Sequence, residues 1–170
     1  GVTALPIPGV DIQIDLLGKV GVQKDRFEVP EGVASPLAGY SPAIRYDDYV
    51  GLAGEVPTDW VGDWMSEKHM GRTGSTDPRT RPNEYLWYGN QMELQVELTL
   101  EKQAKIAEAS GSRAENLFNA TAYIGHPADF TTMDKVWRRW FPDRNVARTV
   151  VPYSGLGGKG WRFETTWDLL

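Results

Sequence analysis

The sequence contains no cysteine, which excludes a disulfide framework, a thiolate metal site and a cysteine nucleophile. Its two histidines, His69 and His126, lie far apart without ligand spacing, so no metal and no cofactor are predicted. No apolar run approaches the roughly 20 residues that cross a bilayer. Because its 23 Asp and Glu outnumber its 18 Lys and Arg, the sequence lacks the basic charge pattern of a nucleic-acid binder. We expect a cytoplasmic protein that binds neither nucleic acid nor a membrane.

The 170 residues are enough for one well-buried domain and too few for two ordinary ones. Alternating apolar residues predict strands, and a hairpin over 43–54 is expected to turn at Asp47 and Asp48. An apolar stripe of helical spacing predicts a helix over 129–141, which Pro142 ends. The remaining predicted strands cover 10–17, 26–29, 116–124, 147–151 and 161–167.

The segment from Gln91 to Gly111 carries two conflicting signals. Its apolar residues alternate as in a strand, yet Met92, Val96 and Leu100 are also spaced by four. Strong helix formers fill 101–109, and Gly111 stands where a helix would end, so we predict a helix. The element order is then β-β-α-β-α-β-β, an α+β fold with the helices on one face of a sheet.

Several short motifs occur together in a fixed order. They are Ala38-Gly39-Tyr40, the run from Val50 to Pro57, Ala109-Ser110-Gly111, Ala120 to Tyr123, Asp129-Phe130, Ala147 to Pro152, Gly155-Leu156 and Trp161 to Glu164. In this order they resemble the RidA (YjgF) family from about Arg26 to Trp167, with one large insertion at about 58–90 rich in tryptophan. The resemblance implies a chorismate-mutase-like sheet with two helices on one face. It also implies a trimeric or pseudo-trimeric assembly with clefts between subunits.

The family's best-known activity is hydrolysis of enamines and imines to a keto compound and ammonia, and we expect a deaminase-like hydrolase of that kind. By resemblance Arg148 holds the substrate carboxylate, whose planar pair of oxygens matches a guanidinium. Glu164 falls at the family's acidic position, where a partly buried carboxyl directs water and moves a proton. Tyr40 lines the cleft, and the backbone of Gly54 faces the substrate.

Three positions depart from the family pattern. Val150, Asp134 and Ala53 stand where many members have cysteine, asparagine and serine; Ala53 and Asp134 are still expected to line the binding site. The departures favour a second hypothesis, a non-catalytic ligand-binding or scaffolding subunit. Arg148 could alternatively pair with an acidic residue of a neighbouring subunit, and Glu164 could be an ordinary surface residue. A ribonuclease activity, known for some relatives, fits poorly with the acidic charge.

Residues 4–17 resemble the closing segment 155–170 of the same chain, with Gly9 matching Gly160 and Gln13 matching Glu164. This repeat predicts that residues 1–23 are a strand and linker left from an upstream RidA-like repeat, and that 24–170 form a RidA-like domain. The strand would complete the sheet of a partner chain. The expected partners are therefore a small-molecule carboxylate and either further copies of this chain or an upstream RidA-like chain.

Overall fold

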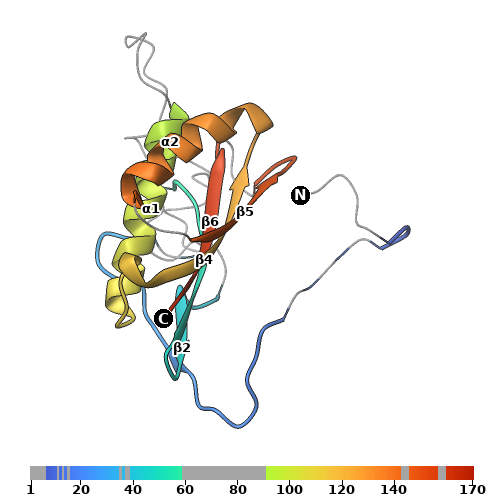
Figure 1. Cartoon of the computed structure of the whole chain (residues 1–170). Coiled ribbons are helices and arrows are strands. Elements are labelled where there is room, and N and C mark those ends of the chain that lie inside the picture. Colours follow the sequence, from blue (N-terminus) through green and yellow to red (C-terminus); the bar gives the residue numbers. More distant parts are fainter. Residues whose placement is uncertain are drawn as a thin grey trace, which may run out of the picture.

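The fold is given by a computed structural model, which describes residues 7–10, 12, 14, 16–34, 36, 39–58, 91–142, 146–156 and 160–170. Two helices and a sheet form the domain (Figure 1). The helices are α1 (Gln91–Ala109) and α2 (Phe130–Trp140), with short 3-10 turns η2 (Ala114–Asn116) and η3 (Pro127–Asp129). The strands are β1 (Asp25–Arg26), β2 (Ala43–Tyr46), β3 (Tyr49–Glu55), β4 (Leu117–Ile124), β5 (Ala147–Pro152) and β6 (Phe163–Leu169).

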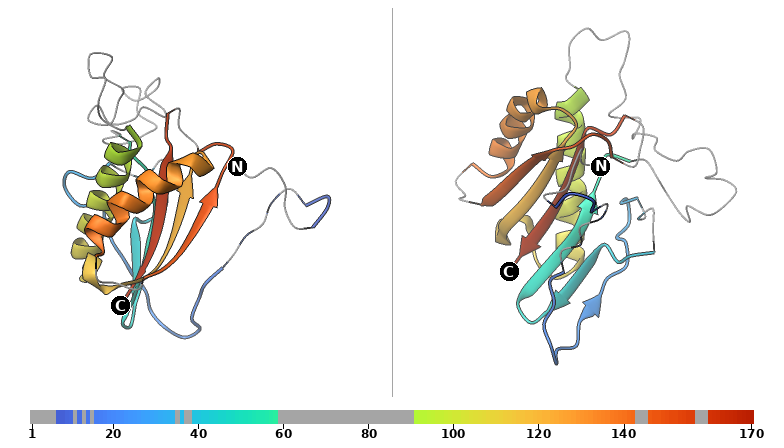
Figure 2. Two further views of the ribbon diagram at one scale, coloured as in Figure 1. Left: turned by 45° about the horizontal axis from the view of Figure 1, so that its top comes forward. Right: turned by 90° about the vertical axis from the view of Figure 1, so that its right-hand side faces the viewer.

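The six strands make one mixed sheet in the order β1-β2-β3-β6-β4-β5. All neighbours are antiparallel except β4 and β5, which run parallel and are joined through α2. Both helices cover the same face of the sheet (Figure 2). The α+β architecture and the single helical layer predicted from the sequence are confirmed.

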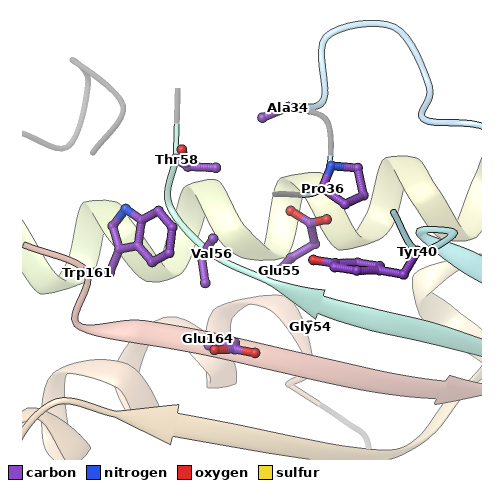
Figure 3. Close-up of a pocket in the computed structure, with 9 residues that line it drawn as sticks. All are labelled: Ala34, Pro36, Tyr40, Gly54, Glu55, Val56, Thr58, Trp161 and Glu164. Atoms are coloured by element: carbon purple, nitrogen blue, oxygen red, sulfur yellow. The ribbon is translucent and has the colours of Figure 1, made fainter. Parts of the chain in front are cut away.

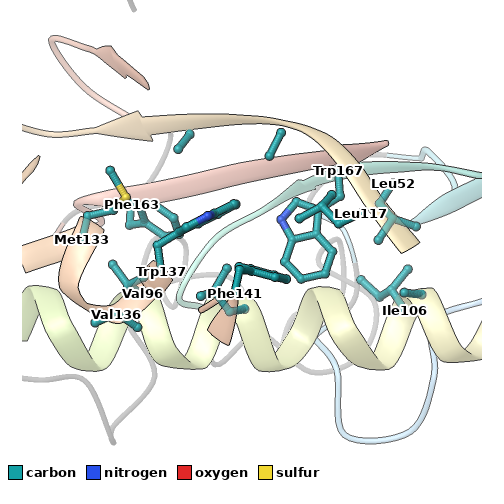
Figure 4. Packing of buried hydrophobic residues seen from close by; sticks show 14 of the residues in the cluster. Leu52, Val96, Ile106, Leu117, Met133, Val136, Trp137, Phe141, Phe163 and Trp167 are labelled. Atoms are coloured by element: carbon teal, nitrogen blue, oxygen red, sulfur yellow. The ribbon is translucent and has the colours of Figure 1, made fainter. Parts of the chain in front are cut away.

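The helix predicted at 91–111 is confirmed because its buried positions recur every three or four residues along α1. Its apolar stripe packs on the sheet around Trp167, whose indole meets the ring of Phe141 edge-on at a centroid distance of 5.7 Å (Figure 4). Phe163, also fully buried, extends this core along β6. Among the described residues no helix is long and apolar enough to cross a membrane.

The hairpin predicted around Asp47 is also confirmed, and Asp47 adopts the left-handed φ of 50° that such a tight turn requires. The strand predicted over 26–29 is wrong in extent, because only Asp25 and Arg26 pair with β2. In the range 10–17, where a strand was predicted, residues 10, 12, 14, 16 and 17 are described; none of them is in a strand or pairs with one in the described part of the chain. The insertion at 58–90 lies outside the described residues apart from Thr58.

Alternation along β6 divides the sheet into two faces. Phe163, Thr165, Trp167 and Leu169 are buried under the helices, so Glu164, Thr166 and Asp168 point to the opposite, open face. On that open face Asp168 accepts hydrogen bonds from Tyr49 and, at 2.6 Å, from Asn119. This division decides which predicted site residues can meet.

Candidate functional site

A pocket of about 130 Å³ opens where β3 and β6 separate at one end of the sheet. The ladder between the two strands slips between Leu52 and Glu55, and this irregularity leaves room between them. Figure 3 shows the lining residues, which come from the loop before β2, from β3 and from the start of β6. They are Ala34, Pro36, Tyr40, Gly54, Glu55, Val56, Thr58, Trp161 and Glu164.

Gly54 allows Glu164 to lie in this pocket. A methyl group on Gly54 would stand 2.3 Å from Oε1 of Glu164, closer than any real contact allows. The sequence therefore has glycine where two strands bring a carboxyl group against the backbone. Gly54 and Glu164, two of the predicted site residues, thus lie next to each other in this pocket.

A second carboxyl group, that of Glu55, shares the pocket and was missed at the sequence level. Its side chain is almost fully buried, with 4% of its surface exposed, and burial raises its pKa to about 7. The negative charge of Glu164 raises this pKa further, whereas the ammonium of Lys102, 3.9 Å from Oε2, lowers it. Near neutral pH the pocket thus holds a carboxyl group that exchanges a proton readily.

Lys102 is fixed in place by two backbone carbonyls. Its Nζ donates hydrogen bonds to the carbonyl oxygens of Val56 at 2.9 Å and Thr58 at 2.8 Å. A lysine within the apolar stripe of α1 was the available signal, because a buried ammonium needs a nearby acid or acceptor.

Tyr40 closes one side of the pocket, with its hydroxyl directed toward Glu55 (Figure 3). Partial burial, and then the charges of Glu55 and Glu164, raise the pKa of Tyr40 to about 12, so it remains a neutral donor. Burial likewise raises the pKa of the Glu164 carboxyl above its ordinary value. The opposite wall is formed by Trp161, whose buried Nε1 has no hydrogen-bond partner within the described part of the chain.

Arg148 lies away from this pocket, on the helix-covered face of the sheet. It is opposite Ala120 of β4, a core residue, and its guanidinium lies 4.9 Å from the ring centroid of Trp137. Asp134 accepts a hydrogen bond from Nη2 of Arg148 and another from Arg138 at 2.6 Å. These two arginines hold the pKa of the Asp134 carboxyl below its usual range, despite partial burial.

Arg148 and Glu164 therefore do not share a pocket within one chain, and the expectation that they act together does not hold at that level. Glu164 is opposite Tyr123 of β4, one residue out of phase with the inward-facing Ala120 and Ala122. Ala53 lies on the open face, in a separate shallow hollow, and its carbonyl oxygen accepts a hydrogen bond from Gln103. Within one chain, therefore, one small substrate does not touch both predicted groups.

The chemistry available in the pocket is proton transfer at a small polar molecule. Glu55 and Glu164 are acid–base groups of raised pKa, and Tyr40 is a donor. The described residues contain no group of three or more metal ligands. The arrangement suits a reaction in which water is activated by a side chain.

Comparison with known proteins identifies the relatives of this chain. A family model described as Endoribonuclease L-PSP matches residues 32–167. A RutC family protein of Pyrococcus horikoshii is 25% identical over 127 residues, which cover 74% of this chain and 82% of that protein. The mitochondrial protein mmf2 of Schizosaccharomyces pombe is 34% identical over 70 residues, 38% of this chain. That match spans 56% of the length of mmf2.

Solved structures show the same fold at low sequence identity. The crystal structure of Escherichia coli TdcF with bound serine is 18% identical and superposes with a TM-score of 0.64, covering 86% of this chain and 98% of TdcF. The crystal structure of a Thermotoga maritima protein described as a putative endoribonuclease is 21% identical with a TM-score of 0.64, over 86% of this chain and 97% of that protein.

Proposed function

Because this chain belongs to the endoribonuclease L-PSP family, which is the RidA (YjgF) family, we propose that it hydrolyses a carbon–nitrogen bond. The substrate is an enamine or imine that carries a carboxylate, and the products are a keto compound and ammonia. The observation that carries the proposal is the pair of carboxyl groups of raised pKa, Glu55 and Glu164, in one pocket with Tyr40.

Both carboxyl groups transfer protons in the reaction. Glu164, as the carboxylate, takes a proton from water as the water oxygen bonds to the carbon of the C=N group. Glu55, partly protonated near neutral pH, gives its proton to the imine nitrogen, which yields a carbinolamine. Glu164 then passes the proton taken from water to the amino nitrogen, Glu55 accepts the proton of the hydroxyl, and the carbon–nitrogen bond breaks to release ammonia and the keto compound. Two carboxyl groups in one pocket, one ionised and one protonated, suit these two opposite roles.

Arg148 holds the substrate carboxylate from a second chain. Its Nη1 is buried and has no hydrogen-bond partner within the described residues, so the guanidinium must turn outward from Asp134 to present this donor to a carboxylate. The bound serine in TdcF carries a carboxylate, which supports a ligand of this class for a relative of the same fold. In this proposal the chain works as a trimer or pseudo-trimer, and each cleft joins Arg148 of one chain to Glu164 of another.

The second candidate is a ligand-binding subunit without chemistry. The ion pair between Arg148 and Asp134 favours it, because the guanidinium is already engaged by an acid of its own chain. An RNA substrate suits the net charge of −5 poorly. The three alternatives differ in what they release: ammonia, nothing, or nucleotides.

Ammonia release from freshly generated 2-imino acids tests the proposal. Losing Arg148 in an Arg148→Ala variant removes a charge-assisted contact, so KM should rise about 10- to 150-fold. Glu164→Gln removes the base, so kcat should fall about 10²- to 10⁴-fold. Arg139→Ala, on the exposed side of α2, should behave like the wild type. If Arg148→Ala and Glu164→Gln both retain wild-type kinetics, the deaminase assignment is wrong.

A subunit-mixing experiment tests whether the site joins two chains. Arg148→Ala and Glu164→Gln, each inactive alone at low substrate, are unfolded and refolded together in equal amounts. Random assembly then creates intact clefts between about one quarter of neighbouring pairs, and that fraction of activity should return. If no activity returns, either both groups act within one chain or they do not form a site together.

A further inference from the structure

Of the segment before β1, the described residues 7–10, 12, 14 and 16 extend away from the domain and expose a row of large apolar side chains. We call residues 7–17 of it the N-terminal arm. Ile12 and Ile14 are each 73% exposed and Leu16 is 90% exposed. Figures 1 and 2 show the blue part of the trace extending away from the sheet. Exposed apolar residues at every second position are the pattern of a strand with one face to be buried.

The arm repeats the unit that leads into β6. Gly9 corresponds to Gly160, and the two glycines share a left-handed backbone, with φ of 79° and 85°. In the same register Ile12, Ile14 and Leu16 match Phe163, Thr165 and Trp167, which all point into the core. Sequence pattern and backbone conformation therefore agree on one equivalence, between the arm and the Gly160–β6 unit.

The Gly160 turn has a specific role in its own domain. Gln95 of α1 donates through Nε2 to the carbonyl oxygen of Gly160 at 2.8 Å and accepts from the amide of Arg162 at 2.8 Å. These two hydrogen bonds fix β6 under α1. Because Gly9 has the same positive φ, the arm can form the equivalent pair of hydrogen bonds in another domain of this fold.

The arm cannot take that place in its own domain. β6 is already in the centre of the sheet, paired with β3 on one side and β4 on the other. A second intact copy is excluded for the same reason, because its β6 position is also filled. The fitting recipient is a RidA-like domain in which this central position is open.

The reach of the linker sets where the recipient lies. Lys19 forms an ion pair with Asp47 at the tip of the β2–β3 hairpin, so the arm departs from that corner. From Leu17 to Asp25 the chain has eight Cα–Cα steps and spans at most about 26–29 Å. Since a domain of this size has a radius of gyration of about 14 Å, the recipient must pack directly beside the hairpin.

We propose that the N-terminal arm is the central β6 strand of a second RidA-like domain, whose sheet it completes between the β3 and β4 equivalents. Ile12, Ile14 and Leu16 then lie under the helices of that domain. Backbone hydrogen bonds to both neighbouring strands hold the arm, and the apolar row sets its register. This assignment does not depend on the proposed reaction.

Photo-crosslinking of the full chain in its natural host tests the assignment. p-Benzoylphenylalanine replaces Ile14 in one variant and Val20, which is fully exposed and outside the arm, in the other. We expect the probe at position 14 to link to the helix-facing core of a RidA-like domain other than residues 24–170, and the probe at position 20 not to. A gain in mass on a gel identifies a separate partner chain, and an internal link identifies a domain of the same polypeptide; both support the assignment.

Hydrogen exchange provides a second readout in the same assembly. Amides of residues 12–17 should exchange at least about 10³-fold more slowly than in an unstructured peptide, because a central strand is bonded on both sides. Ile14→Asp should abolish this protection, whereas Val20→Asp should leave it. Links from position 14 to an edge strand of a second copy, no link at all, or unprotected amides would each overturn the proposal. Deaminase activity is not part of either readout, so its failure is separate.

Discussion

Replacing Glu55 with glutamine should remove a pH dependence of stability that burial creates. The pKa of the Glu55 carboxyl is 4.5 without the protein environment and about 7 in the pocket. Between these values the folded protein binds more protons than the unfolded chain, so the free energy of unfolding falls as pH rises. A difference of about 2.5 pKa units corresponds to about 3 kcal/mol lost between pH 4.5 and pH 7. Glutamine keeps the shape of the side chain and cannot ionise.

Urea unfolding at about pH 4.5 and about pH 8 measures the effect. The two proteins should be equally stable at the lower pH, and Glu55→Gln should be more stable by about 3 kcal/mol at the higher pH. Glu108→Gln, at an exposed position of α1, is the matched control and should follow the wild type. Equal pH slopes for wild type and Glu55→Gln would refute the reasoning, because Glu55 would then ionise as easily folded as unfolded.

Three further substitutions test the site and the core. Gly54→Ala places a methyl group 2.3 Å from Oε1 of Glu164, so the carboxyl must move; kcat for imine hydrolysis should drop about 10²-fold, and an unchanged kcat would contradict this. Gln103→Leu leaves two carbonyls, one on β3 and one on β6, without the amide that bridges them. The free energy of unfolding, measured with urea, should fall by about 2–4 kcal/mol, and a fall of less than about 1 kcal/mol would contradict this role of Gln103. Trp167→Ala empties the centre of the core and should lower the free energy of unfolding by about 3–5 kcal/mol in the same assay. It should also remove the near-ultraviolet circular dichroism signal of the packed indole ring.

Local patterns in the sequence were sufficient for most elements of the fold. The stripe of α1, the Asp47 turn and the alternation of β6 are each set by residues close together in the chain, where side-chain spacing and turn geometry act. The ordered family motifs added the kind of sheet and the placement of two helices on one of its faces. The strand signal in residues 10–17 was equally clear, yet the described strands include none that pairs with it. Periodicity shows that a face is to be buried, and it does not show by what.

The residues of the candidate site show which features the sequence predicts and which depend on the tertiary structure. Sequence motifs alone selected Tyr40, Gly54 and Glu164, which share a pocket. Only the tertiary structure showed that Glu55 joins them, because its raised pKa depends on burial and on Lys102, 47 positions away in the chain. It also placed Arg148 on the opposite face of the sheet, since successive residues of a strand point to opposite sides and the helices cover only one. Local motifs in the sequence identify the candidate residues. Their burial and their neighbouring side chains, in contrast, are set by strands and helices that are distant in sequence.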